Sequence, residues 1–327
     1  MSDKVIPGLV SVIVASYNHA EFLEQRLDSL INQTYQDIEI LVIDDCSTDN
    51  SVEILLRYES HPKVRLIVRG QNGGWVTVSN QGVEMSAGEF IVFANCDDAC
   101  ELQMVERLVA AMRAYSTAGI SYCRSLMIDE NSNIVGDDFL GREKLFRVKC
   151  YIDALITKKE MSRFLLHSCV IPNLSAALFR KEHFISVGGL TSDYRVCSDW
   201  DLFFRMATRY DVAYIAAPLN KFRQHETTIR SSTKGRVIYE EIIRLLLGQI
   251  KVLDLTLMER IKSRTRVMYI WAFHLASPSF NGIFNFYYHF KRVMHHDPFA
   301  LIFLPFAILL RLAALLIKLL SKFIKWN

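Results

Sequence analysis

The first hundred residues alternate between two patterns, one typical of buried strands and one typical of helices. Runs rich in β-branched and apolar residues at 9–16, 38–45, 63–69 and 89–95 predict four strands. The segments between them carry helical spacing, with cap-type residues before the second helix. The sequence therefore predicts an α/β fold, a Rossmann-like mixed sheet that is mostly parallel and is flanked by helices.

Polar clusters follow three of the predicted strands, at the points where these strands end. They read "ASYN" at 15–18, "DDCSTD" at 44–49 and "NCDD" at 95–98. A single cluster of this kind is most simply a capped loop. Ligands of parallel α/β sheets bind at the carboxyl ends of the strands, so three clusters at one edge favour a binding site.

Four possible metal ligands fall within five residues at 96–100, which overlap the third cluster. Zinc prefers thiolates and imidazoles from two separated pairs, and Cys96 and Cys100 have no second cysteine pair at such spacing. Adjacent carboxylates such as Asp97 and Asp98 instead suit Mg²⁺ or Mn²⁺, which also bind phosphate oxygens. We expect the two cysteines to be packing residues.

Residues 174–226 add three motifs. Residues 174–190 predict a strand, a short helix and a glycine turn, and 198–210 predict an amphipathic helix. Asp199 lies in the first turn of that helix, where the helix dipole favours carboxylates. The next strand pattern ends in "FRQHE", which contains His225. Taken alone, Asp199 could be a helix-terminal acid and His225 a structural histidine.

In series, these motifs resemble the family 2 inverting glycosyltransferases, which have the GT-A fold. The resemblance includes "VSVIVASYN", "VIDDCSTDNS", "FANCDDA", "VGGL", "SDWDLFFRMA" and "FRQHETT", and runs from about residue 9 to about residue 230. It implies a catalytic domain at 1–235, with a nucleotide-sugar half at about 1–125 and an acceptor half at 126–235. The rest, 236–327, is expected to be a helical C-terminal region.

The resemblance implies nucleotide-sugar binding by residues of the first half. Ala15 and Tyr17 match positions that face the nucleotide base. Asp45 matches the carboxylate that hydrogen-bonds the base, and Asp44 stands beside it. Asp97 matches the acid near the ribose and the diphosphate.

The resemblance also implies a metal site and a catalytic base. Asp98 matches the ligand of a Mn²⁺ or Mg²⁺ ion, and His225 resembles a late histidine that can reach this metal or the diphosphate. Asp199 matches the base that deprotonates the acceptor hydroxyl. Three positions depart from the family, with Asn95 where an acid is frequent, Cys46 where glycine is common and Ser198, before the base, where glutamate is common.

The last hundred residues are helical in pattern and strongly apolar. An uncharged stretch at 299–310 has only twelve residues and contains Pro305, whereas a spanning helix needs about twenty. Extending it would include Arg311. Basic residues then recur on one narrow stripe, and a tryptophan follows; these residues are Arg311, Lys318, Lys322, Lys325 and Trp326. This pattern favours an amphipathic helix at about 299–326 lying in a membrane interface, with spanning and soluble packing as alternatives.

Together these features predict a metal-dependent enzyme that moves a sugar from a nucleotide-diphosphate sugar, most plausibly a UDP-sugar, to a saccharide hydroxyl. A lipid-linked acceptor, such as a polyprenyl-diphosphate saccharide of a bacterial surface glycan, fits an enzyme held by anionic lipid on the cytoplasmic face of the inner membrane. The net charge of +3 argues against nucleic-acid binding. The alternatives are a non-catalytic nucleotide-sugar or glycan-binding protein and a nucleotidyltransferase.

Overall fold

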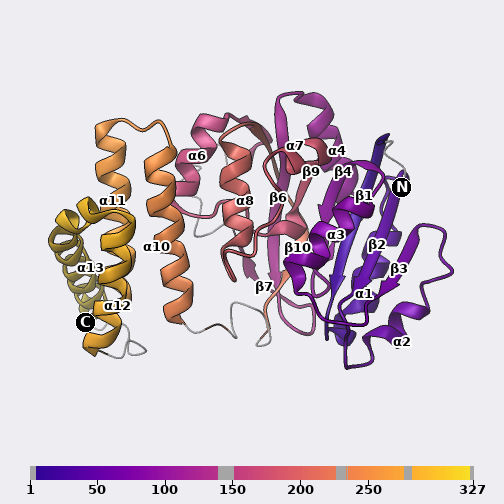
Figure 1. Ribbon diagram of the computed structural model, residues 1–327, viewed down its shortest axis with the longest axis horizontal. Coiled ribbons are helices and arrows are strands. Elements are labelled where there is room, and N and C mark those ends of the chain that lie inside the picture. The colour runs from indigo at the N-terminus through magenta and orange to yellow at the C-terminus, as the bar shows by residue number, and fades with distance from the viewer. Residues whose placement is uncertain (1–4, 139–150, 226–232, 234, 276–281, 325–327) are drawn as a thin grey trace. The chain divides into compact units, whose positions relative to one another are not determined.

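The computed structural model describes residues 5–138, 151–225, 233, 235–275 and 282–324 (Figure 1). The chain forms two compact units. One comprises Met1–Asp193 and Ser198–Glu226, and the other comprises Tyr194–Cys197 and Thr227–Asn327. We call them the sheet unit and the helical unit, after the elements that they contain.

The sheet unit is built on one mixed sheet whose main path runs β3-β2-β1-β4-β9-β6-β10-β5, with β7 beside β6 and β8 beside β10. Its strands are β1 (Ile6–Ser16), β2 (Ile38–Asp44), β3 (Val64–Val68), β4 (Gly88–Phe93), β5 (Ala99–Cys100), β6 (Ala118–Ile128), β7 (Ile134–Asp137), β8 (Ala154–Ile156), β9 (Ala177–Arg180) and β10 (Asp211–Arg223).

The same unit contains helices that lie between these strands in the chain. They are α1 (Ala20–Ile31), α2 (Ser51–Leu56), α3 (Trp75–Met85), α4 (Met104–Ala114), α6 (Lys158–His167), the 3₁₀ turn η2 (Leu174–Ala176), α7 (Lys181–Ser186) and α8 (Ser198–Ala207). The predicted α/β sheet with flanking helices is confirmed.

Parallel pairing unites the four strands of the first hundred residues that the sequence predicted. β1 pairs in parallel with both β2 and β4, and β2 pairs in parallel with β3. β9 is antiparallel to β4 and to β6, and therefore joins this part to the parallel pair of β6 and β10. The predicted strands are thus found, but the sheet changes direction at β9.

One hydrophobic core fixes the helices on this sheet. Val10, Val12 and Val14 alternate along β1 and are fully buried, together with Leu27 of α1 and Leu108 of α4. Residues two apart on a strand share a face, so this alternation creates a continuous apolar surface for the helices. Because β1 is parallel to both β2 and β4, the carboxyl ends of these three strands lie at the same edge of the sheet.

The helical unit contains α10 (Gly235–Val252), α11 (Leu257–Leu275), α12 (Gly282–His296), the 3₁₀ helix η3 (Pro298–Phe303) and α13 (Leu304–Ile324). Within it, α10 packs against α11 and α12, and α11 packs against α13. Among the helices of the described residues, none is long and apolar enough to cross a membrane.

The apolar segment predicted as one helix at about 299–326 is divided in the structure. η3 ends at Phe303, and α13 begins at Leu304 with Pro305 in its first turn. Proline is tolerated there because the first-turn N–H groups have no partner within the helix. Lys325 and Trp326 lie outside the described residues, as do the side chains of Lys318 and Lys322.

Gly88 offers a test of how tightly β1 and β4 are paired. A Cβ atom built at Gly88 would lie 2.7 Å from the Leu9 carbonyl oxygen and 2.8 Å from the Ser11 nitrogen. We expect Gly88→Ala to lower the free energy of unfolding by about 1–3 kcal/mol, the usual cost of overpacking. Chemical denaturation of the purified protein measures this change.

Gly70→Ala is the matched control for this prediction. A Cβ atom at Gly70 has no neighbour within 4 Å, and Gly70 belongs to the same unit. This substitution should leave stability unchanged or raise it by up to about 1 kcal/mol, because it restricts the unfolded chain. Equal effects of the two alanines would contradict the close approach at Gly88.

Candidate active site

The three polar clusters predicted from the sequence lie at the same edge of the sheet, and hydrogen bonds join two of them. The Asp45 amide donates to the Ser16 carbonyl at 2.8 Å. The Asn18 amide donates to the Ser47 hydroxyl at 3.0 Å, and the Asn18 side chain accepts from the Thr48 amide at 2.8 Å. The loops after β1 and β2 are therefore one connected structure.

The two carboxylates after β2 both bind loop groups in the structure. Asp44 is fully buried and accepts hydrogen bonds from the Ser47 amide at 2.9 Å and from the Ser47 hydroxyl at 2.5 Å. Asp45 accepts from Arg69 at 2.6 Å and from the amides of Gly73 and Gly74 at 2.8 Å each. These contacts shape the loop that leads into α3.

The two predicted positions on β1 and its loop are more accessible than these acids. Ala15 is half-buried at the end of β1. The side chain of Tyr17 is 43% exposed and follows directly after the strand. Both residues are therefore placed where a flat ligand could lie over the carboxyl end of the sheet.

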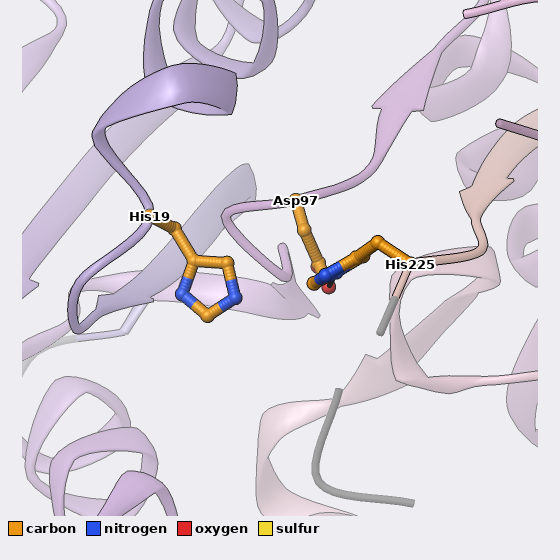
Figure 2. Close-up of side chains that lie close together, drawn as sticks. All are labelled: His19, Asp97 and His225. Carbon is orange, nitrogen blue, oxygen red and sulfur yellow. Dashed lines mark hydrogen bonds and ion pairs between the residues drawn. The ribbon is translucent and has the colours of Figure 1, made fainter. Parts of the chain in front are cut away.

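A cluster of two histidines and one carboxylate forms where three distant segments meet (Figure 2). His19 precedes α1, Asp97 lies in the loop after β4, and His225 follows β10. One ligand atom of each lies within 4.8 Å of the others. His225 Nε2 lies 2.9 Å from Asp97 Oδ2. The side chains of Asp97, His225 and His19 are thus close enough together to hold one metal ion.

The backbone near His19 determines which of its ring nitrogens can bind a metal. His19 Nδ1 lies 2.7 Å from the carbonyl oxygen of Tyr17. A carbonyl can only accept a hydrogen bond, so Nδ1 carries the proton and Nε2 keeps a lone pair. This arrangement, with one ring nitrogen on a carbonyl and the other free to ligate, is usual for metal-binding histidines.

Electrostatics keep Asp97 in the charged form that a metal ligand needs. Burial opposes its charge, but the hydrogen bond from His225 and the nearby charges of His19 and His225 lower the pKa of Asp97 below its usual range. The same hydrogen bond raises the pKa of His225, against the effect of burial. A cation could take the place of the His225 proton in balancing Asp97.

Asp98 has a different environment from its neighbour. It is 1% exposed, and its carboxylate accepts hydrogen bonds from the Arg223 amide at 2.9 Å and from the Asn95 side chain at 3.3 Å. Burial and then the charge of Asp97 raise the pKa of Asp98, while the buried cation Arg26 opposes the rise. Metal ligation by Asp98 stays a prediction.

Arg223 connects the segments of the cluster and was not identified from the sequence. Its guanidinium donates to the carbonyl of Asp97 at 2.7 Å and to the carbonyl of Asp129 at 2.6 Å. It also lies 4.6 Å from the centre of the Phe22 ring, which allows a cation–π contact. Arg223 thereby fixes the backbone of Asp97 from a position two residues before His225.

Asp199 lies in the first turn of α8, as the sequence predicted. The helix is anchored on both sides of this residue, since Ser198 Oγ donates to the Thr191 carbonyl at 2.6 Å and Trp200 Nε1 donates to the Leu165 carbonyl at 3.2 Å. Arg205 of the same helix pairs with Asp201 at 2.8 Å. Asp199 itself accepts the Trp200 amide at 2.7 Å and is half-buried.

The described residues thus combine an α/β sheet, a polar cluster at its carboxyl edge and a carboxylate at the start of a later helix. The sequence model of the family "Glycosyl transferase family 2" matches residues 11–188, more than half of the chain. The chain therefore belongs to glycosyl transferase family 2 and is a glycosyltransferase.

Individual relatives agree with this assignment. An uncharacterized glycosyltransferase of Rickettsia typhi is 27% identical over 272 residues, which cover 81% of this chain and 79% of that protein. Chondroitin synthase of Pasteurella multocida is 30% identical over 142 residues, or 42% of this chain and 15% of that protein. The family thus includes polysaccharide synthases among the relatives of this chain.

Solved structures show the same fold. A crystal structure of residues 1–349 of TarS from S. aureus, in complex with UDP-GlcNAc, superimposes with a TM-score of 0.67. The alignment covers 90% of this chain and 83% of that one, at 17% sequence identity. At this identity the likeness concerns the fold alone.

Proposed function

We propose that this protein is an inverting glycosyltransferase that moves a sugar from a nucleotide-diphosphate sugar to a saccharide hydroxyl. The observation that carries the proposal is the cluster of His19, Asp97 and His225 at the carboxyl edge of a family 2 sheet. A UDP-sugar is the proposed donor, supported by the UDP-GlcNAc bound to the structurally similar TarS. The acceptor is proposed to be a growing surface glycan.

The donor set of the cluster fits a divalent cation. His19 Nε2 has a lone pair, Asp97 favours its ionised form, and a third ligand can come from His225. Imidazole nitrogens favour Mn²⁺ over Mg²⁺, because Mg²⁺ strongly prefers oxygen ligands and retains its water. When bound, such an ion would neutralise charge on the diphosphate of the donor.

The residues of the chain divide the reaction between them. Ala15, Tyr17 and Asp45 are proposed to bind the nucleotide, with Asp44 holding the loop. The acceptor oxygen attacks the anomeric carbon as Asp199 takes its proton, and the bond from that carbon to the diphosphate oxygen breaks. One displacement from the face opposite the leaving group inverts the configuration at the anomeric carbon.

Replacement of the proposed base tests this mechanism. We expect Asp199→Asn to lower kcat for sugar transfer by about 10²–10⁴-fold, the usual contribution of general base catalysis, and to leave donor binding unchanged. Transfer of radiolabelled sugar and calorimetric titration with UDP measure the two quantities.

Asp201→Asn, on the same helix, is the control for Asp199→Asn. It removes the ion pair with Arg205 and should affect stability more than kcat. Full transfer by Asp199→Asn would remove that residue from the mechanism. Donor binding without transfer by the unsubstituted chain, across a panel of acceptors, would instead favour the non-catalytic binding protein.

The ligand set is tested by metal binding, without reference to activity. We expect His19→Gln and Asp97→Asn each to weaken Mn²⁺ binding in the presence of UDP by at least about tenfold, since even second-shell losses have such effects. Electron paramagnetic resonance of free Mn²⁺ measures the affinity. Asp98→Asn decides between the carboxylates, because an effect there but none at Asp97 would identify Asp98 as the ligand.

The surface of the helical unit supports a membrane-associated acceptor. η3 and the start of α13 present large apolar side chains that are more than half exposed, namely Phe299, Ile302, Phe306 and Leu309. A monomeric soluble protein rarely exposes a large contiguous apolar patch, and such patches often bind other proteins or membranes. We propose that this segment lies in the membrane interface on the cytoplasmic face, close to a lipid-linked acceptor.

Substitution of these side chains tests the membrane proposal. The triple variant Phe299→Ser, Ile302→Ser and Phe306→Ser should lower binding to vesicles containing anionic lipid by at least about tenfold, because each apolar side chain contributes about 1.5–3 kcal/mol when buried. Flotation of the full-length protein with vesicles measures the bound fraction. Leu257→Ser with Met258→Ser, equally exposed at the start of α11, is the control. Equal binding by the triple variant would contradict the proposal.

A further inference from the structure

The chain leaves the sheet unit for four residues immediately before the helix that carries Asp199. Tyr194–Cys197 belongs to the helical unit, although Asp193 and Ser198 on either side belong to the sheet unit. Ser198 is the first residue of α8, and Asp199 is the second. Contacts to this short segment therefore act on the backbone immediately before α8.

A single carboxylate holds the segment by its backbone. Glu241 of α10 accepts the amides of Arg195 and Val196 at 2.8 Å each, and the amide of Cys197 at 3.1 Å. The side chain of Glu241 is buried, with 6% of the residue exposed. Successive backbone N–H groups that converge in this way form an anion-binding nest, and here a side chain of the same chain fills it.

A second contact from α10 reaches the beginning of the segment. The guanidinium of Arg244 lies 4.2 Å from the centre of the Tyr194 ring. Residues three apart on a helix share a face, so Glu241 and Arg244 contact the segment from the same side of α10. Cys197, the last residue of the segment, is buried as well.

We infer that Glu241 is a positioning residue for Asp199, which rests on the proposed role of Asp199 as the base. A carboxylate that abstracts a proton must lie within hydrogen-bond reach of the acceptor hydroxyl, and a misplacement of about 1 Å can cost about 100-fold in rate. Cys197 is bonded to the first residue of α8, so the three hydrogen bonds to Glu241 restrain the backbone two residues before Asp199. Glu241 would thus act on Asp199 through the backbone of Tyr194–Cys197.

Glu241→Gln in the full-length enzyme tests this inference. Glutamine keeps the size of the side chain but turns an NH₂ group toward one or more amides, so the segment loses acceptors. We expect kcat for transfer, counted per UDP-binding site, to fall about 10–100-fold, with the KM for the donor unchanged. Glu241→Asp keeps both oxygens and should restore part of kcat.

Glu240→Gln is the matched control on the same helix. Glu240 accepts the hydroxyl of Tyr288 at 2.6 Å and pairs with Arg292 at 3.1 Å, and so contacts α12 and not the segment before α8. This variant should lose stability and keep kcat. A purely structural role for Glu241 would give the same result for both variants.

Three results would overturn the inference. They are an unchanged kcat in Glu241→Gln, a loss of transfer fully explained by fewer UDP-binding sites, and a Glu240→Gln variant equally impaired per site. If Glu241→Gln does not fold, kcat per UDP-binding site and the number of such sites are compared between Glu241→Asp and the unsubstituted enzyme. Retained transfer by Asp199→Asn would refute the proposed base, whereas loss of transfer in Asp199→Asn beside an unchanged Glu241→Gln would refute only this inference.

Discussion

The join between the end of β10 and the loop after β4 is the interaction on which the site depends. The Arg223 amide binds the Asp98 carboxylate at 2.9 Å, and the Arg223 guanidinium binds the Asp97 carbonyl at 2.7 Å. Arg223 and Asp98 are buried, so water competes little for these hydrogen bonds. Leaving a buried polar group without its partner would be costly in free energy. This join brings His225 to within 2.9 Å of Asp97 although the two are 128 positions apart in the chain.

Much of the fold could be predicted because hydrophobic periodicity records burial directly. β1, β2, β3 and β4 were found within a few residues of their observed ends, as was the helix that begins at Ser198. β6 and α4 were not predicted, although both are largely buried. The reversal of strand direction at β9 could not be predicted either, because pairing direction depends on which strands become neighbours and not on the pattern within one strand.

The residues of the candidate site also divide into those that the sequence predicted and those that it did not. Motif resemblance selected Asp97, Asp199 and His225, because their residue types recur at recognisable positions. His19 and Arg223 were missed, since one enters the cluster by the course of the loop after β1 and the other acts through backbone carbonyls. Cys46 is informative in retrospect. It has a φ of 66°, in the left-handed region that favours glycine, which agrees with the glycine that the resemblance implies at this position.

The carboxylates of this protein fall into two groups by what they bind. Asp44, Asp45, Asp98 and Glu241 bind backbone amides or a neighbouring arginine, and hold a loop in place. Asp97 instead faces imidazole side chains, with 16% of its side chain exposed. A carboxylate whose oxygens bind amides has fewer lone pairs for a ligand, whereas one paired with a titratable imidazole can exchange that partner for a cation. The loop-holding acids therefore build the rigid support that a precisely placed reactive group requires.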